Sequence, residues 1–140
     1  MTDPVEREGG CLCGRIRYRI TGEPFQTEYC HCRMCQRSVG SAVVNWMDFK
    51  AEQVEWLADE PKEYTSSKTV RRGFCPDCGA SLNFRETRYP QFASLTMASL
   101  DDANAFAPTR HIYTESQLEW LVIEDDCPRF QREEGAEGGA

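Results

Sequence analysis

Short segments of alternating apolar and polar residues recur along the chain. In residues 15–20, RIRYRI, the apolar Ile16, Tyr18 and Ile20 alternate with three arginines, which is the period-two pattern of a strand with one buried face. Further strands are predicted where segments rich in Val, Tyr, Phe, Trp and Thr are bounded by Gly, Pro, Asp or Asn. These segments are residues 42–49, 53–57, 62–67, 69–74, 80–86, 91–100 and 110–114.

Helical periodicity is weak by comparison. Only residues 34–39 and 100–105 are expected to form short helical turns, and no long stripe of period 3.6 is present. We therefore predict one antiparallel all-β domain over residues 1–130. The last ten residues, QREEGAEGGA, are rich in Gly and Glu, and we expect residues 131–140 to be a disordered tail.

Length and charge narrow the class of protein. A chain of 140 residues with 40% hydrophobic residues is typical of a single globular domain. No apolar run approaches the roughly 18 residues of a membrane span, and the first ten residues lack the order of a signal peptide, so we expect a cytoplasmic protein that binds no membrane. The net charge of −7 argues against a nucleic-acid partner, which would require a basic face.

Eight cysteines are the most informative feature. In a cytoplasmic chain disulfides rarely persist, so clustered thiols indicate metal ligands or redox groups. Cys11 and Cys13 stand two residues apart among glycines, and such residues project from one face of an extended segment. Cys75 and Cys78 form a C-P-D-C-G knuckle, and two such paired elements typically build a zinc site with four cysteine ligands.

A third group, Cys30, Cys32 and Cys35, places three thiols within six positions. Three protein ligands with an open position are the pattern of a catalytic zinc, whereas four ligands are the pattern of a structural one. The spacing leaves the partition open, because a site that mixed the first and third groups would satisfy the same count. A redox pair, an iron–sulfur cluster and two purely structural zinc ions also remain alternatives.

The remaining polar candidates surround these cysteines. If its segment is extended, His31 points away from a metal bound by its neighbours, so we expect it to support the ligands or lie at the surface. His111 is expected to be a packed strand histidine, and Cys127 an inert or surface thiol. Arginines near the cysteines are expected either to be solvated or to offset thiolate charge and hold a substrate carboxylate; they are Arg33, Arg37, Arg71 and Arg72, and Arg33 and Arg37 are the preferred candidates for substrate contact.

In these motifs the chain resembles the glutathione-dependent formaldehyde-activating enzymes, a family that includes centromere-protein-V relatives. The matching segments run from about residue 9 to residue 130 and are GGCLCGRIRYRITGEP, YCHCRMCQRSVGSA, RGFCPDCGASLNF, ASLDD, HIYTESQLEW and DDCPRF. Cys127 departs from the pattern, because family members more often carry an apolar residue there. The resemblance implies an Mss4-like β-tent of twisted antiparallel sheets stapled by zinc.

The resemblance also implies a partition of the cysteines and an activity. It assigns a structural zinc to Cys11, Cys13, Cys75 and Cys78, and a second, catalytic zinc to Cys30, Cys32 and Cys35. It further implies a carbon–sulfur lyase that adds a small thiol such as glutathione to an aldehyde such as formaldehyde, giving an S-hydroxymethyl adduct. The alternative is a non-catalytic zinc module that binds a protein or buffers metal, because fold and family alone do not determine an activity.

Overall fold

Strands arranged in two sheets make up most of the regular structure. The computed structural model describes residues 3–133. The smaller sheet has the order β1-β2-β5 and the larger one the order β10-β3-β4-β9-β8-β7-β6. The strands are β1 (Glu6–Gly10), β2 (Arg17–Thr21), β3 (Gln26–Cys30), β4 (Val44–Lys50), β5 (Val54–Trp56), β6 (Lys62–Thr65), β7 (Val70–Phe74), β8 (Ser81–Glu86), β9 (Phe92–Thr96) and β10 (His111–Ile112). The expected all-β class is therefore confirmed as a mostly β fold with a short helix.

Strand β2 has the burial that its alternation predicts. Ile16, Tyr18 and Ile20 are fully buried, and the intervening Arg17 and Arg19 remain partly exposed. Both arginines form ion pairs with Glu8 on the neighbouring strand β1. One face of the small sheet therefore supplies the core, and the other carries a network of surface charges.

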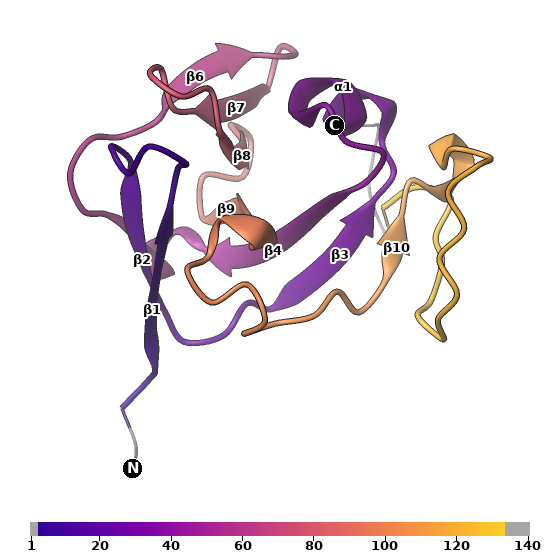
Figure 1. Ribbon diagram of the computed structural model, residues 1–140, viewed down its shortest axis with the longest axis horizontal. Coiled ribbons are helices and arrows are strands. Elements are labelled where there is room, and N and C mark those ends of the chain that lie inside the picture. Colours follow the sequence, from indigo (N-terminus) through magenta and orange to yellow (C-terminus); the bar gives the residue numbers. More distant parts are fainter. Residues whose placement is uncertain (1–2, 134–140) are drawn as a thin grey trace.

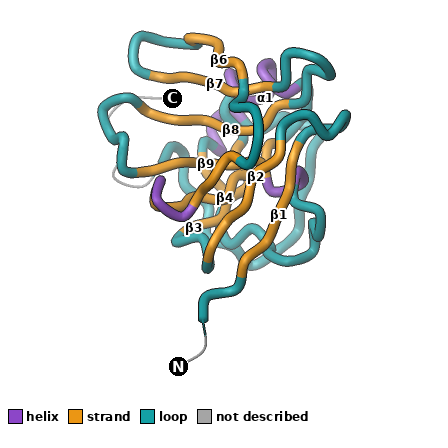
Figure 2. Tube along the Cα trace, turned by 90° about the vertical axis from the view of Figure 1, so that its left-hand side faces the viewer, coloured by secondary structure: helices purple, strands orange, loops and turns teal. Residues whose placement is uncertain are grey.

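The two sheets pack through a shared apolar core. Figure 1 shows the β1–β2 hairpin at the left, steeply inclined to β3 and β4, with β6, β7 and β8 above it and the α-helix to their right; Figure 2 shows the same elements from the hairpin side. The core cluster joins both sheets and consists of Tyr18, Ile20, Met47, Phe49, Leu95, Met97 and Leu100. A second cluster includes Cys30, Cys32 and Cys35, and a third includes Cys11 and Cys75.

Two strands were not predicted. β1 has the sequence EREGG and β3 the sequence QTEYC, and neither shows an alternating apolar pattern. β1 pairs along its length with β2, and β3 pairs with β4. Their backbone hydrogen bonds to strongly patterned neighbours, rather than their own side chains, place them in the sheets.

One edge of the larger sheet departs from the antiparallel prediction. β10 runs parallel to β3, with His111 opposite Tyr29 and Ile112 opposite Cys30, so the prediction of a wholly antiparallel domain is wrong at this edge. The other strand pairs of residues 3–133 are antiparallel. The long connection between β3 and β10 allows a parallel return, which a hairpin cannot give.

The helical turns are short. Helix α1 (Arg33–Val39) confirms the turn predicted for residues 34–39. The segment 91–100 divides into β9 and the 3-10 turn η2 (Met97–Ser99). Of the predicted turn at residues 100–105, Leu100 forms a β-bridge with Gly9 and residues 101–105 form bends and turns rather than a helix. Two more 3-10 turns are η1 (Ala51–Gln53) and η3 (Thr114–Ser116). Residues 134–140 of the predicted tail lie outside the described residues.

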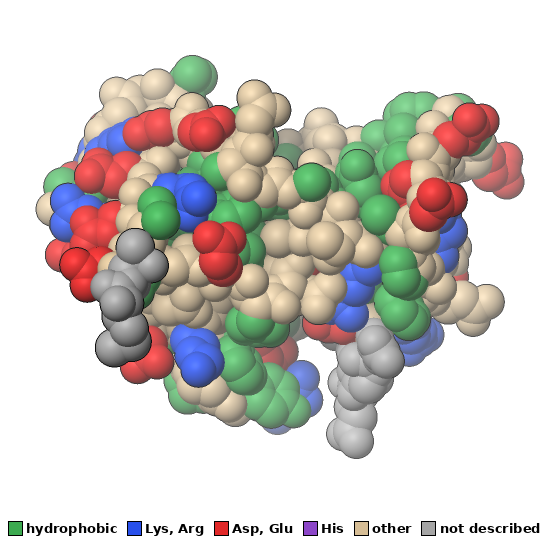
Figure 3. All heavy atoms as spheres, turned by 90° about the horizontal axis from the view of Figure 1, so that it is seen from below, with side chains coloured by type: hydrophobic (Ala, Val, Ile, Leu, Met, Phe, Trp, Pro, Cys, Tyr) green, Lys and Arg blue, Asp and Glu red, His purple; other side chains and the backbone are tan. Residues whose placement is uncertain are grey.

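The surface carries both signs of charge. On the face shown in Figure 3, Lys and Arg side chains are scattered among Asp and Glu side chains. Ion pairs such as Arg17 with Asp101 and Arg85 with Glu63 account for part of this mixing. Among residues 3–133, none of the helices has both the length and the apolar character needed to cross a membrane.

Candidate functional site

Four cysteines from two distant parts of the chain meet at one point. Cys11 and Cys13 lie in the turn between β1 and β2, and Cys75 and Cys78 lie in the turn between β7 and β8. All four sulfurs lie within 4.8 Å of one another. The sulfurs of Cys11 and Cys13 are 3.6 Å apart, and those of Cys13 and Cys75 are 3.7 Å apart.

These separations fit a tetrahedral zinc ion. Four thiolates at about 2.3 Å from zinc stand about 3.8 Å from one another in a regular tetrahedron. A set of four sulfurs without nitrogen or oxygen ligands is typical of structural zinc. The structure thus pairs the first and second groups of cysteines, and this pairing excludes, for Cys11 and Cys13, the site mixed with the third group.

Backbone geometry shapes the turns around this centre. Gly14 and Gly79 have φ values of 83° and 77°, a region that is strained for residues with a side chain. The backbone N–H of Ile16 donates to the Cys11 sulfur at 3.2 Å, and that of Asp77 donates to the Cys75 sulfur at 3.4 Å. Such N–H groups stabilise thiolates before and after a metal binds.

The thiols of this centre differ in acidity. The pKa of Cys78 falls to about 6, chiefly because the backbone N–H groups of Ala80 and Cys13 donate to its sulfur. The pKa of Cys11 is also lowered: burial opposes ionisation, but a hydrogen bond from Ile16 and bonds from neighbouring thiols outweigh it. The pKa of Cys13 is instead raised to about 12: a backbone hydrogen bond from Arg15 lowers it, but burial and the neighbouring thiols outweigh that bond. A thiolate is the form that binds metal, so Cys11 and Cys78 are the thiols most ready to bind a cation.

The third group of cysteines has a different environment. Cys30 ends β3, Cys32 precedes α1 and Cys35 lies within α1. All three are buried, and they pack with Val44, Trp46, Ile112 and Tyr113. The Cys30 and Cys35 sulfurs are 3.6 Å apart, a separation that also suits two ligands of one ion.

The Cys32 thiol is the acidic member of this group. Its pKa falls to about 2, because the thiols of Cys30 and then Cys35 donate hydrogen bonds to its sulfur. The same contacts raise the pKa of Cys30 well above its ordinary value. Among the described residues, three or more ligand atoms converge within 4.8 Å only at the first centre and not here, so a second metal remains a prediction.

Arg72 of β7 reaches the third group from the opposite side. Its Nη1 donates to the Cys35 sulfur at 3.3 Å, and its Nε donates to the Ser66 Oγ at 3.1 Å. The guanidinium also lies over the Phe84 ring, 5.2 Å from its centroid. The sequence offered Arg72 only as one arginine among four, because nothing local shows that β7 faces α1.

Two buried histidines form a chain with an aspartate. His31 Nε2 lies 2.9 Å from His111 Nδ1, and His111 Nε2 lies 2.9 Å from Asp125 Oδ2. Because the carboxylate accepts from His111 Nε2–H, His111 Nδ1 must accept from His31 Nε2–H when both rings are neutral. His31 Nδ1 is then a buried acceptor, and no partner for it occurs within the described residues.

These hydrogen bonds refine the expectations for His31 and His111. Both histidines are fully buried, so His31 does not lie at the surface, and it supports the segment between Cys30 and Cys32 instead. His111 is a packed strand histidine, as expected, and it stacks on Tyr29 at 4.5 Å. Asp125 was not among the predicted residues, because an acidic residue in an irregular acidic segment gives no local signal.

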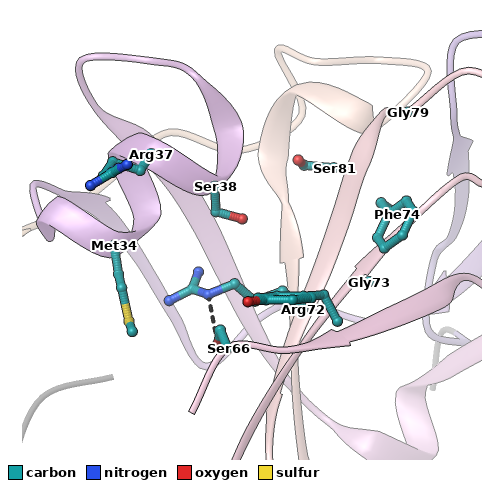
Figure 4. Close-up of a pocket in the computed structure, with 10 residues that line it drawn as sticks. Met34, Arg37, Ser38, Ser66, Arg72, Gly73, Phe74, Gly79 and Ser81 are labelled. Carbon is teal, nitrogen blue, oxygen red and sulfur yellow. Dashed lines mark hydrogen bonds between the residues drawn. The ribbon is translucent and has the colours of Figure 1, made fainter.

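A pocket of about 540 Å³ is lined by sequence neighbours of both groups of cysteines, such as Met34 of α1 and Gly79 after Cys78, but by no cysteine itself. Figure 4 shows Met34, Arg37 and Ser38 of α1 on one side and Phe74, Gly79 and Ser81 on the other, with Arg72 and Ser66 across the bottom of the view. Pockets of this size accommodate small molecules. Its wall is formed on one side by helix α1, which carries Cys35, and on the other by residues that flank the turn of Cys75 and Cys78.

The two preferred arginines are separated by the structure. Arg37 is exposed and lines the pocket. Arg33 is not among the lining residues and donates to Gln36 Oε1 at 3.2 Å. Cys127 is not part of the four-cysteine cluster, and its sulfur lies 3.8 Å from the Pro108 carbonyl oxygen; its role as an inert thiol stays a prediction.

Fold and centre together define a mostly β protein with a four-cysteine metal site. The chain belongs to the family described as glutathione-dependent formaldehyde-activating enzyme, whose profile matches residues 6–116. Among curated proteins, it is 32% identical over 84 residues to an uncharacterized lyase of Schizosaccharomyces pombe. That match covers 59% of this chain and 59% of the relative's length.

The fold also has a counterpart among solved structures. A crystal structure of a Rhodobacter sphaeroides protein superposes with a TM-score of 0.57 and 19% identity, covering 72% of this chain and 97% of that one. At this identity the similarity concerns the fold alone. The family membership and the β architecture inferred from the sequence are thus confirmed.

Proposed function

We propose that this protein is a carbon–sulfur lyase that adds a small, glutathione-like thiol to an aldehyde such as formaldehyde. Membership of the family and the relative named a lyase support the reaction class. The observation that carries the proposal is the position of the third cysteine group. It is buried beside a pocket through the Arg72–Cys35 contact, and it is separate from the four-cysteine centre.

Two zinc ions are proposed for the two groups. Cys11, Cys13, Cys75 and Cys78 hold one, in a closed site whose role is structural. Cys30, Cys32 and Cys35 hold the second, for which the 3.6 Å separation of the Cys30 and Cys35 sulfurs is favourable. A zinc ion with three thiolate ligands would supply a soft position at which an added thiol is deprotonated.

The reaction itself conserves atoms and oxidation states. The thiol sulfur bonds to the carbonyl carbon, the carbon–oxygen double bond becomes a single bond, and the thiol proton ends on that oxygen. The reverse sequence breaks the carbon–sulfur bond, which is the lyase direction. No redox partner is required.

The residues of the pocket would bring the two reactants together. Serines 38, 66 and 81 line it, and their hydroxyl groups are able to donate to the aldehyde oxygen as its charge grows. Confinement of thiol and aldehyde in one pocket lowers the entropic barrier of a bimolecular addition. The apolar neighbours Met34 and Phe74 exclude part of the water that competes for the aldehyde.

The alternative is a zinc module without activity, which binds a protein or buffers metal. The four-cysteine centre alone would suit that role. The pocket beside the third group favours the enzyme instead, because a purely structural zinc pair needs no cavity between its two sites.

The test combines metal counting with adduct formation on the purified protein. Wild type is expected to hold two zinc ions and to accelerate exchange between formaldehyde, glutathione and S-hydroxymethylglutathione, followed by NMR with ¹³C-formaldehyde. Cys32→Ser is expected to fold, hold one zinc ion and lose the acceleration.

Cys127→Ser is the matched control and should behave as wild type, since Cys127 contacts neither group. Full occupancy of both zinc ions in Cys32→Ser would contradict the partition of the ligands. Wild-type rates equal to the spontaneous exchange would favour the inactive module.

A further inference from the structure

The pocket beside the third cysteine group carries a charge opposite to that of the protein. The whole chain has a net charge of −7, yet the charged residues that line the pocket are Arg37 and Arg72, and no Asp or Glu lines it. Arg37 is exposed, whereas only 5% of Arg72 is exposed. An acidic protein therefore presents a local positive surface at this cavity.

Of these two arginines, Arg72 is the unusual one, because it is buried and a buried guanidinium needs partners for all its donors. Nε is bonded to Ser66 and Nη1 to Cys35. Nη2 is buried and has no hydrogen-bond partner within residues 3–133. No carboxylate is paired with this guanidinium in the described residues, since the ion pairs of the protein involve other arginines.

The direction of the side chain supports a ligand at this point. Figure 4 shows the Arg72 guanidinium projecting from β7 toward α1, into the space bordered by Met34, Ser38 and Ser66. The Phe84 ring and Ser66 hold its plane. A rigid, oriented donor at a cavity wall is a preorganised site for one oxygen of an anion.

We propose that Arg72 is the specificity-determining residue of the pocket and selects small ligands that carry a carboxylate. Its Nη2 donates to one carboxylate oxygen while Nη1 keeps the Cys35 sulfur in place. This inference rests on the proposed function, for which it names the substrate class: a thiol whose carboxylate binds Arg72 and whose sulfur points toward the third cysteine group. Arg37, at the exposed side of the same pocket, adds a weaker attraction for the same charge.

The test compares two ligands that differ only in the anionic group. Binding of 3-mercaptopropionate and 3-mercapto-1-propanol to the zinc-loaded protein is measured by calorimetry. Wild type is expected to bind the acid at least about tenfold more tightly, as a charge-assisted hydrogen bond to a buried donor allows. In Arg72→Gln the two affinities should become nearly equal, and Arg72→Lys should restore part of the preference.

Arg71→Gln is the matched control. It makes the same charge change on the preceding residue of β7, but Arg71 donates to the carbonyl oxygens of Ser67, Lys68 and Val70 and does not line the pocket. It should keep the wild-type preference. Equal affinities of the two ligands for wild type, an unchanged ratio in Arg72→Gln, or an equal loss in Arg71→Gln would each overturn the proposal.

A ligand without sulfur separates this proposal from the proposed function. Butyrate should compete with 3-mercaptopropionate in wild type and in Arg71→Gln, and competition should be lost in Arg72→Gln. If butyrate competes but no adduct forms with any thiol, the carboxylate site stands and the lyase activity fails. If adducts form equally well with both thiols and butyrate does not compete, the activity stands and the role of Arg72 fails. The wild-type comparison needs no substitution, so equal affinities there would overturn the proposal even if an Arg72 variant did not fold.

Discussion

The two groups of cysteines have the same side chain but occupy different positions in the fold. The four-cysteine centre joins two turns that are 62 residues apart along the chain, from Cys13 to Cys75, and two of its members, Cys13 and Cys78, are at least partly exposed. The group of Cys30, Cys32 and Cys35 comes from one short segment and is wholly buried. It reaches the pocket only through Arg72, which contacts Cys35 and lines the cavity. The first group ties distant parts of the fold together, whereas the second adds little to chain closure.

The free energies of loop closure and of zinc binding support this difference between the two groups. Closure of a 62-residue loop costs roughly 3.7 kcal/mol of chain entropy. Zinc binding at a structural site in small peptides contributes about 10–16 kcal/mol. The closure cost is therefore well within what one zinc ion supplies at the first centre. The second group closes only a few residues, so the metal that we propose there would serve to bind a ligand rather than to stabilise the fold.

The largest effect is expected from Cys75→Ser. Cys75 is fully buried and its sulfur accepts two backbone N–H bonds, so the substitution should destroy the centre and leave the protein unfolded or aggregated. Thermal unfolding followed by circular dichroism, with zinc counting, measures this. Cys127→Ser is the control for a lost thiol. A soluble Cys75→Ser protein with an unchanged Tm would show that the centre does not hold the fold.

Chelation should separate the two centres without any mutation. At low chelator concentration one equivalent of zinc should leave with little change in Tm, because the third group has an incomplete ligand set. The second equivalent should leave only as the protein unfolds. Zinc release followed with a metallochromic dye during a thermal scan provides the measurement. Simultaneous release of both ions on unfolding would remove the distinction between the centres.

Glu28, on the strand that carries Cys30, offers a change in the stabilising direction. Burial, then the charge of Asp48, raises the pKa of Glu28 to about 10, although Arg110 lies 3.6 Å away. Burial outweighs this ion pair, because one carboxylate oxygen has no partner. The folded protein therefore keeps the proton that the unfolded chain loses above its ordinary pKa of 4.5, and the free energy of unfolding decreases as the pH rises toward 10.

Glu28→Gln should remove this dependence. At about pH 8 the variant should be more stable than wild type by about 1–3 kcal/mol, and at about pH 4 the two should be equal. Urea unfolding at both pH values measures the difference. Glu63→Gln is the opposite control, because a hydrogen bond from Arg85 lowers the pKa of Glu63, so its loss should slightly destabilise the protein at the higher pH. Equal stability of Glu28→Gln and wild type at that pH would mean that Glu28 is ionised in the fold.

The smallest effect is expected from Asp125→Asn, and it should be confined to the second region. The His111 hydrogen bond lowers the pKa of Asp125 to about 2, so its carboxylate orders both histidine tautomers across the neutral range. The variant should lose a few degrees of Tm and change the imidazole ¹⁵N shifts of His111 and His31 in NMR, while the four-cysteine centre keeps its zinc. The exposed neighbour in Asp126→Asn should change neither. Unaltered imidazole shifts in Asp125→Asn would contradict the hydrogen-bonded series from His31 through His111 to Asp125.

The local sequence pattern predicted the structure correctly where a strand is amphipathic and where the candidate ligands stand close together in the sequence. The burial of Ile16, Tyr18 and Ile20 and the turn of α1 follow from residues adjacent in sequence. Strand β1 was missed because EREGG has no apolar alternation of its own and depends on β2 for its hydrogen bonds. The parallel edge formed by β10 was missed for a related reason, since two residues are too few to carry a pattern.

The sequence by itself determined the family, the mostly β class and the identity of the cysteines able to bind metal, because each depends on residue types at short, characteristic spacings. Only the tertiary structure decided that Cys11 and Cys13 meet Cys75 and Cys78, that His31 reaches Asp125 through His111, and that Arg72 lies against Cys35 with one donor free. These contacts join residues 14 to 80 positions apart. They arise from how the sheets pack, and no local periodicity along the chain encodes that packing.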